Sequence, residues 1–167
     1  MVRLRAVEED DLPTINKLFW DPDVTQYLDV VWPEPLAETR EWWERARSQA
    51  TALFAIETLP GELIGACELA GIDGRVRSGL VGIWIGKPFW GRGFGTDAVR
   101  TLARFGFREM NLQRIRLLVQ ETNPRAKAAY ENVGFKEEGR LRRASFIGGR
   151  HVDLIEMGLL AEHLLEE

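Results

Sequence analysis

The sequence predicts a single α/β domain over residues 1–167, with a central mixed sheet of six to seven strands and helices on both faces. Three observations support this prediction. The length of 167 residues and the hydrophobic content of 45% are typical of one globular domain. Segments with the twofold alternation of strands interleave with segments of helical periodicity. A glycine-rich turn separates an apolar strand from an amphipathic helix, as in parallel strand–helix–strand units.

The first third of the chain is predicted to contain one strand and two helices. Residues 2–7 alternate apolar and charged side chains, as a half-buried strand does. A helix is expected from Asp10 to a point near Trp20, where an Asp-Pro-Asp sequence ends it. Residues 24–34 are expected to form a loop or a short helix. A second helix is expected over residues 35–50, with an inner face formed by Leu36, Thr39, Trp43 and Ala46.

Three consecutive strands are predicted next, over residues 52–58, 63–72 and 80–85, with a polar loop at residues 73–78. Side chains on both faces of the third strand are apolar, which is typical of a strand at the centre of a sheet. One face of it carries Leu80, Gly82 and Trp84, and the other carries Val81, Ile83 and Ile85.

The second half is predicted to continue with alternating helices and strands. The strand 80–85, a helix over 95–110 and a strand over 115–119 are expected to form a parallel, right-handed unit. The remaining elements are a short helix over 124–132 that ends at Gly134, strands over 139–147 and 151–159 around Gly148-Gly149, and a polar tail over 160–167.

Composition excludes several classes of function. A net charge of −4 and a pI of about 5.4 argue against a nucleic-acid-binding protein. The sequence lacks an apolar run of 18 residues, so we expect no membrane span or signal peptide and a cytoplasmic location. The single cysteine, Cys67, excludes an intramolecular disulfide and is expected in the core. No His, Cys, Asp or Glu cluster has metal-ligand spacing, so no metal site is predicted.

The run WGRGFGT at residues 90–96 is the strongest functional signal. Its three glycines leave consecutive backbone N–H groups uncovered, and the following helix adds its positive N-terminal end. Together with Arg92 these groups predict a seat for a phosphate or diphosphate.

Three phosphate-bearing ligands compete for that seat. A nucleoside-triphosphate loop needs a Lys after its last glycine, but Thr96 and Asp97 follow Gly95. A dinucleotide-binding unit needs a third glycine where Thr96 stands, although Glu121 is suitably placed to hold a ribose. Coenzyme A fits the same cradle, and the amides of its pantetheine arm can pair with the edge of a strand such as 83–85.

The motifs resemble those of the GCN5-related N-acetyltransferases (GNAT) over most of the chain. Residues 90–96 are similar to the family's diphosphate loop, R/Q-x-x-G-x-G/A, with Trp90 at its first position. NPRAKAAYENVGF, at residues 123–135, resembles the segment N-x-x-(S/A)-x-x-x-Y-x-x-x-G-F. WDPDVTQYL, at residues 20–28, resembles the branch that acetylates ribosomal-protein N-termini and spermidine. Leu80 stands where relatives often carry a Glu, so no base is inferred at that position.

The resemblance implies direct transfer of an acetyl group from acetyl-CoA to a primary amine. It places the backbone of Ile83 and Ile85 against pantetheine and the acetyl oxygen. It also implies that Asn123 contacts pantetheine, unless it only caps its helix, and that Tyr130 donates a proton to the leaving thiolate, unless it is a packing residue. The diphosphate-binding residues it implies are Gly91, Arg92, Gly93, Gly95 and Thr96.

The general base and the acceptor stay open. Glu68 is one candidate base, although a solvent-facing position is favoured, and His151, His163, a water chain or an amine that arrives neutral are alternatives. The acceptor is a protein N-terminus, a polyamine, an aminoglycoside or another small amine. A non-catalytic acyl-CoA sensor is the alternative function, and many relatives are homodimers. Residues suited to a cationic amine are Trp20, Asp21, Asp23, Tyr27, Asp29, Trp32 and Glu34.

Overall fold

A computed structural model describes residues 1–49 and 51–165 of the chain. It confirms the predicted mixed sheet, which has seven strands in the order β1-β2-β3-β4-β5-β7-β6. The strands are β1 (Val2–Arg5), β2 (Ala52–Thr58), β3 (Leu63–Asp73), β4 (Ser78–Ile85), β5 (Arg114–Gln120), β6 (Lys136–Ile147) and β7 (Arg150–Leu160). The helices are α1 (Leu12–Phe19), α2 (Pro22–Thr25), α3 (Leu36–Ser48), α4 (Phe94–Arg108) and α5 (Pro124–Glu131), with short 3-10 turns η1 (Glu9–Asp11), η2 (Lys87–Phe89) and η3 (Ala161–His163).

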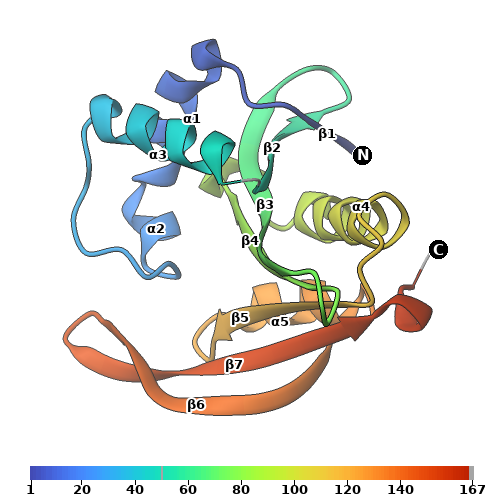
Figure 1. Cartoon of the computed structure of the whole chain (residues 1–167). Coiled ribbons are helices and arrows are strands. Elements are labelled where there is room, and N and C mark those ends of the chain that lie inside the picture. Colours follow the sequence, from blue (N-terminus) through green and yellow to red (C-terminus); the bar gives the residue numbers. More distant parts are fainter. Residues whose placement is uncertain (50, 166–167) are drawn as a thin grey trace.

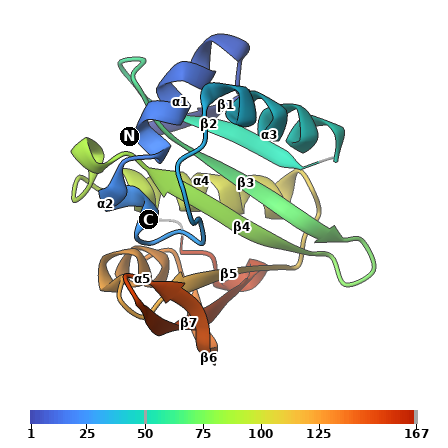
Figure 2. The ribbon, with the colours of Figure 1, turned by 90° about the vertical axis from the view of Figure 1, so that its left-hand side faces the viewer.

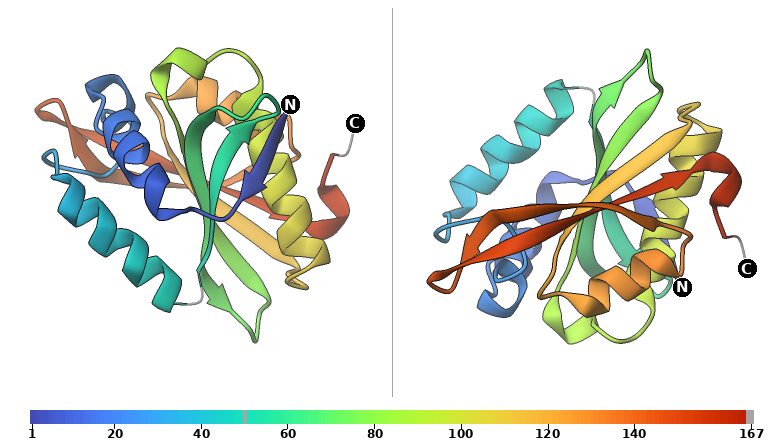
Figure 3. Two further views of the ribbon diagram at one scale, coloured as in Figure 1. Left: turned by 90° about the horizontal axis from the view of Figure 1, so that it is seen from above. Right: turned by 90° about the horizontal axis from the view of Figure 1, so that it is seen from below.

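Helices cover both faces of the sheet, as predicted. Helices α1 and α3 lie on one face and α4 on the other (Figure 1; Figure 3). The larger core lies between α4 and the sheet, and Ala126 and Tyr130 of α5 pack against it. The smaller core, on the α1–α3 face, contains Val7, Leu12, Ile15, Trp43 and Ala55, with Trp84 packed beside it. Alternate residues of β4 therefore face different cores, which explains its apolar pattern on both sides.

Strands β4 and β5 are parallel, as predicted, but they pair over three positions only, from Ser78 opposite Arg114 to Leu80 opposite Arg116. Beyond Leu80 the two strands diverge (Figure 2). On its other side β4 stays paired with β3 as far as Ile85. One edge of β4 is therefore left without a strand partner in the middle of the sheet, and this gap positions the site described below.

The β6–β7 hairpin is longer than predicted and forms an extended arm of the sheet (Figure 1). Gly148 and Gly149 at its tip both have positive φ values, 59° and 78°, as the predicted Gly-Gly turn requires. A bulge interrupts β6, because residues 142–144 lie opposite the single β7 residue Asp153.

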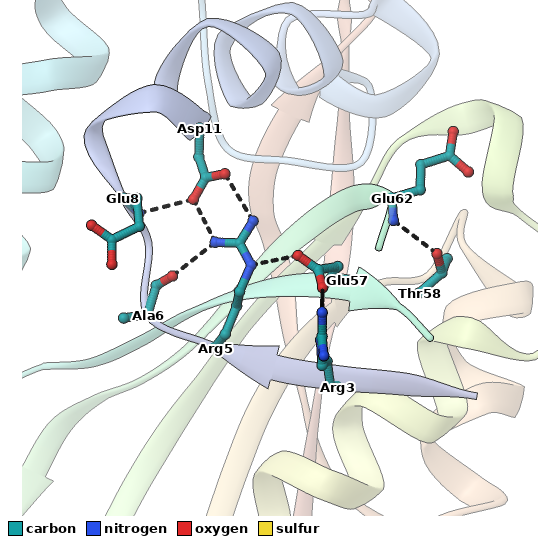
Figure 4. Close-up of polar contacts among 8 residues, drawn as sticks. All are labelled: Arg3, Arg5, Ala6, Glu8, Asp11, Glu57, Thr58 and Glu62. Atoms are coloured by element: carbon teal, nitrogen blue, oxygen red, sulfur yellow. Dashed lines mark hydrogen bonds and ion pairs between the residues drawn. The ribbon is translucent and has the colours of Figure 1, made fainter. Parts of the chain in front are cut away.

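A cluster of charged side chains ties β1 and β2 to the start of α1 (Figure 4). Arg5 donates to Asp11 at 2.7 Å and 2.8 Å and to Glu57 at 2.5 Å. Arg3 also pairs with Glu57, whose side chain is 7% exposed. The Arg5 guanidinium lowers the pKa of Asp11 and of Glu57. This cluster fixes the first helix relative to the sheet.

Three details differ from the sequence prediction. Pro22 does not only end α1 but begins the one-turn helix α2, because Asp21 caps it by accepting from the N–H of Asp23 at 2.9 Å. Leu36, expected on the inner face of α3, is 39% exposed because it stands at the first position of the helix. Helix α3 ends at Ser48; residue 50 of the predicted helix and residues 166–167 of the predicted tail lie outside the described residues.

Candidate active site

The gap between β4 and β5 is a wedge-shaped cavity of about 570 Å³, which we call the wedge. Its walls come from β4, β5, the residues around the start of α4, α5, and α2 with the loop after it, together with Ser145 of β6 and Leu154 of β7. All but one of the residues predicted to bind the cofactor line this cavity, although they come from three separate segments. They are Ile83, Ile85, Gly91, Gly93, Gly95, Thr96 and Asn123, and Tyr130 joins them.

The free edge of β4 presents backbone groups to the wedge. Gly86 donates its N–H to the carbonyl of Ile64 at 2.8 Å, so this position faces β3. Because N–H groups alternate in direction along a strand, those of Ile85, Ile83 and Val81 face the wedge. The carbonyl of Ile85 already accepts the indole N–H of Trp90 at 2.6 Å. The strand can therefore offer N–H donors at Ile83 and Ile85 to a ligand amide or carbonyl, as predicted for these residues.

The glycine loop forms an anion seat at one side of the wedge. Gly91 and Gly93 have positive φ values of 72° and 81°, which side-chain-bearing residues rarely adopt. Among the described residues, no side chain caps the N-terminus of α4, so its first N–H groups stay open to an anion. Asp97 in this first turn is held by the N-terminal ammonium at 3.0 Å and by the N–H of Val2 at 2.8 Å. Partial burial would raise the pKa of Asp97, but these two groups lower it and balance its charge.

Arg92 is the predicted site residue that does not line the wedge. Its side chain turns away and stacks over the ring of Phe94, 5.0 Å from the ring centroid. Another arginine, Arg125 of α5, lines the wedge instead and lies 3.6 Å from the centroid of Trp90. The sequence analysis missed Arg125, although its place two residues after Asn123 in the family segment was a usable signal.

Asn123 and Tyr130 hold the opposite side of the wedge. The side chain of Asn123 accepts from the N–H of Ala126 at 3.2 Å, so it caps α5 and lines the wedge at the same time. Tyr130 packs near Phe135, with ring centroids 6.1 Å apart. Burial raises the pKa of Tyr130 to about 12, and the charge of Arg125 opposes this rise. The phenol therefore stays protonated at neutral pH and can donate a proton within the wedge.

A second cavity of about 410 Å³, here called the acceptor chamber, lies on the α1–α3 face of the sheet. Its walls include Trp20, Trp42 and Trp84 together with the carboxylates of Glu34 and Glu68. The sequence analysis favoured a solvent-facing position for Glu68, but the structure places its side chain in the wall of the chamber. Its side chain packs over Gly82, where an added Cβ would lie 3.0 Å from the carboxyl oxygen, and desolvation raises its pKa. A carboxyl in this environment is suited to accept a proton from a bound amine.

The two cavities meet at β4. Gly82, Ile83 and Trp84 line both of them, and so does Leu28 from the loop after α2. A group held in the wedge and a group held in the chamber would therefore approach each other beside these residues.

The two histidines and Glu121 lie outside this arrangement, whereas Cys67 lines the acceptor chamber. His151 and His163 are exposed and line neither cavity, so neither is placed to act as the base. Glu121 pairs with Arg140 at 3.0 Å. Cys67 is 2% exposed, as expected for a core residue, and burial raises the pKa of its thiol. Residues 1–49 and 51–165 contain no group of three His, Cys, Asp or Glu residues that would hold a metal, and no helix within them is long and apolar enough to cross a membrane.

The acidic and aromatic residues of the segment 20–34 divide between different roles. Trp20 and Glu34 line the acceptor chamber, whereas Tyr27 and Asp29 line the wedge. The remaining three, which line neither cavity, are Asp21, the cap of α2; Asp23, which pairs with Lys87; and Trp32, which is 67% exposed.

Comparisons with known proteins agree with this geometry. The sequence model of the acetyltransferase (GNAT) domain matches residues 2–136. Spermidine N(1)-acetyltransferase of Vibrio cholerae is 32% identical over 97% of this chain and 94% of the relative. A candidate ribosomal N-acetyltransferase of Bacillus subtilis, YdaF, is 33% identical over 71% of this chain and 64% of the relative. The crystal structure of spermidine N-acetyltransferase from Vibrio cholerae in complex with CoA and spermine matches with a TM-score of 0.91 and 32% identity, over 97% of this chain and 96% of that chain.

Proposed function

The chain belongs to the GNAT acetyltransferase family and transfers an acetyl group from acetyl-CoA to an amine, and from this premise we propose that its acceptor is a polyamine. One observation carries the proposal: the wedge and the acceptor chamber share residues 82–84 of β4. The chamber combines three tryptophans and two carboxylates with one cation, Arg45, so its walls are net acidic and suit a cationic aliphatic amine through charge and cation–π contacts.

The wedge residues are proposed to bind acetyl-CoA. The open N-terminus of α4 and the loop at Gly91 and Gly93 would hold the diphosphate. Arg125, which also lines the wedge, adds a positive charge. The free N–H groups of Ile83 and Ile85 would bind the pantetheine arm and the acetyl oxygen.

The proposed transfer occurs in one step between the two bound substrates. The amine nitrogen forms a bond to the thioester carbonyl carbon, and the bond from carbon to sulfur breaks. Glu68 accepts the proton that the amine loses, and Tyr130 donates a proton to the departing thiolate. The elevated pKa values of both side chains suit these roles, because each group must hold or receive a proton near neutral pH.

A protein N-terminus is a second candidate acceptor. The similarity to YdaF and the resemblance of residues 20–28 to the branch of ribosomal-protein acetyltransferases favour it. A peptide N-terminus would enter the same chamber, but the rest of the peptide would need an open path across the exposed loop around Trp32.

An acceptor panel tests the proposal. Release of free CoA thiol is measured with acetyl-CoA and either spermidine, spermine, an aminoglycoside or peptides with different N-termini. We expect the highest kcat/KM for a polyamine. A higher kcat/KM for a peptide would identify a protein N-terminus, rather than a polyamine, as the acceptor. Light scattering on the same sample tests whether the chain forms a homodimer, as many relatives do.

A further inference from the structure

Ser145 is the buried polar side chain that the proposed mechanism does not use. It is 5% exposed, and its Oγ is the only buried side-chain oxygen or nitrogen among the described residues that lacks a hydrogen-bond partner. A buried hydroxyl without a partner is destabilising, so such a group in a native structure calls for an explanation. Ser145 also lines the wedge, so a ligand can supply the missing partner.

The bulge in β6 places Ser145 there. Residues 142–144 lie opposite Asp153 alone, and Arg143 adopts a left-handed φ of 52°. Asp153 fixes this irregular backbone, because it accepts from the N–H of Arg143 at 2.8 Å and from the guanidinium of Arg140 at 2.8 Å. Beyond the bulge, Ser145 lies opposite Val152. The contacts of Asp153 and the pairing with Val152 therefore fix the backbone at Ser145.

Strand alternation shows which substrate Ser145 faces. Leu117 and Val119 of β5 pack in the core beneath α4, so Gln120 lies on the opposite face of the sheet, the face on which α1 packs against β3 and β4. Leu154 pairs with Gln120 and shares that face. Val152 lies two residues along β7 from Leu154, so its partner Ser145 also lies on this face of the sheet, which is the face of the acceptor chamber, although Ser145 itself lines the wedge.

Ser145 lies too far from β4 to contact the reacting nitrogen. The reaction site is beside residues 82–84 of β4, whereas β6 lies three strand positions away in the order β4-β5-β7-β6. Neighbouring strands are about 4.8 Å apart, so even a curved sheet separates the two places by several bond lengths. Asp29 also lines the wedge and adds a negative charge to its walls. Figures 1 and 2 show α2 and the loop that follows it between α1 and the β6–β7 hairpin.

We propose that Ser145 binds a second nitrogen of the acceptor, so that the enzyme selects amines with two or more separated amino groups. The Ser145 hydroxyl accepts a hydrogen bond from the distant ammonium, and Asp29 balances its charge. The acceptor would extend from the chamber past residues 82–84 into the wedge, and the buried Oγ of Ser145 would turn to another staggered rotamer to meet it. This inference rests on the proposed polyamine function and adds a specificity-determining residue to it.

The test compares two acceptors of equal chain length, a linear diamine and the corresponding monoamine, in wild type, Ser145→Ala and Ser145→Cys. We expect Ser145→Ala to lower kcat/KM for the diamine about 10-fold through KM, and for the monoamine less than 2-fold. The KM for acetyl-CoA stays unchanged. Ser145→Cys shows an intermediate loss, because its thiol is a weaker hydrogen-bond acceptor of similar size.

Thermal unfolding separates binding from a structural role. Because the hydroxyl is unpaired in the free protein, Ser145→Ala keeps or raises the Tm. Ser48→Ala is the control, since the Ser48 hydroxyl bonds the carbonyl of Arg45 and lines neither cavity. Equal losses for both amines, no loss, or a loss that accompanies a lowered Tm would each overturn the role of Ser145. If the wild type acetylates neither amine, the polyamine function itself is refuted; if it acetylates the diamine and Ser145→Ala does so equally well, the inference about Ser145 alone is refuted.

Discussion

Tyr130→Phe isolates the proposed proton donor. The substitution removes one hydroxyl and keeps the ring that packs near Phe135 and the core beneath α4, so we expect folding and acetyl-CoA binding to stay intact. The pKa of Tyr130, about 12, means that essentially every molecule carries the phenolic proton at pH 8. General acid catalysis contributes at least about 100-fold, and losing it raises the barrier by about 2.7 kcal/mol.

The assay for this variant has two parts. Thiol release at saturating acetyl-CoA and amine gives kcat, for which we expect a fall of about 100-fold. Calorimetric titration with acetyl-CoA gives Kd, for which we expect a change of less than 2-fold. Tyr27→Phe is a matched control, because Tyr27 is the only other tyrosine and also lines the wedge. Its ring lies 6.1 Å from that of Trp90, and its hydroxyl has no proposed part in proton transfer, so we expect a much smaller change in kcat than for Tyr130→Phe.

Two results would refute the reasoning about Tyr130. A kcat within 3-fold of wild type shows that the thiolate leaves without this proton. A rise in Kd that accounts for the whole loss in kcat/KM shows that the hydroxyl binds the cofactor rather than acting in the transition state.

Glu68→Gln is expected to lower kcat 10-fold or more at pH 7 without changing the Kd for acetyl-CoA, and an unchanged kcat would assign proton removal to water or to an amine that arrives neutral. Gly93→Ala introduces a Cβ at a φ of 81° and 3.3 Å from the side chain of Met1, so calorimetry should show weaker CoA binding. Gly74→Ala is the control, because its Cβ would have no neighbour within 4 Å, and it should bind CoA normally. Equal CoA binding by the two variants would remove Gly93 from the anion seat. Asp11 has a lowered pKa in the folded state because Arg5 pairs with it, so its contribution to stability is complete above about pH 4 and is lost as the pH falls through the folded pKa. Urea unfolding from pH 6 to pH 3 should show a smaller loss of stability for Asp11→Asn than for wild type, and parallel curves would contradict this assignment.

Local patterns in the sequence were sufficient for the sheet and its centre. The alternation of Leu80, Gly82 and Trp84 with Val81, Ile83 and Ile85 predicted a strand buried on both faces, and the structure has β4 as the fourth of seven strands. A short helix was expected only as an alternative to a loop over residues 24–34, and its start at Pro22 was missed, because one turn is too short to show helical periodicity. Its cap, Asp21, was visible in the sequence, but it was interpreted only as part of a helix-ending signal.

The lining of the site was predictable where a motif fixes the backbone, and less so where a side-chain rotamer decides whether a residue lines the cavity. Gly91, Gly93 and Asn123 line the wedge because turn and cap geometry places them. Arg92 stands in the same loop, yet its side chain stacks on Phe94, a contact that no local pattern encodes. Ser145 was unpredictable because its burial depends on a bulge fixed by Asp153, eight residues further along the chain.

The interrupted pairing of β4 and β5 also determines the order of chemical events. The two cavities proposed for the substrates meet at residues 82–84, so acetyl-CoA and the amine could be bound at once. A covalent acyl-enzyme would need a nucleophile at this junction. Cys67 of β3 pairs with Ile83 and lines the acceptor chamber, but it is 2% exposed and its thiol has a raised pKa, so it carries little thiolate at neutral pH. The geometry therefore favours a ternary complex and sequential kinetics, in which the amine attacks the thioester directly and the wedge in the sheet is the passage through which the two substrates meet.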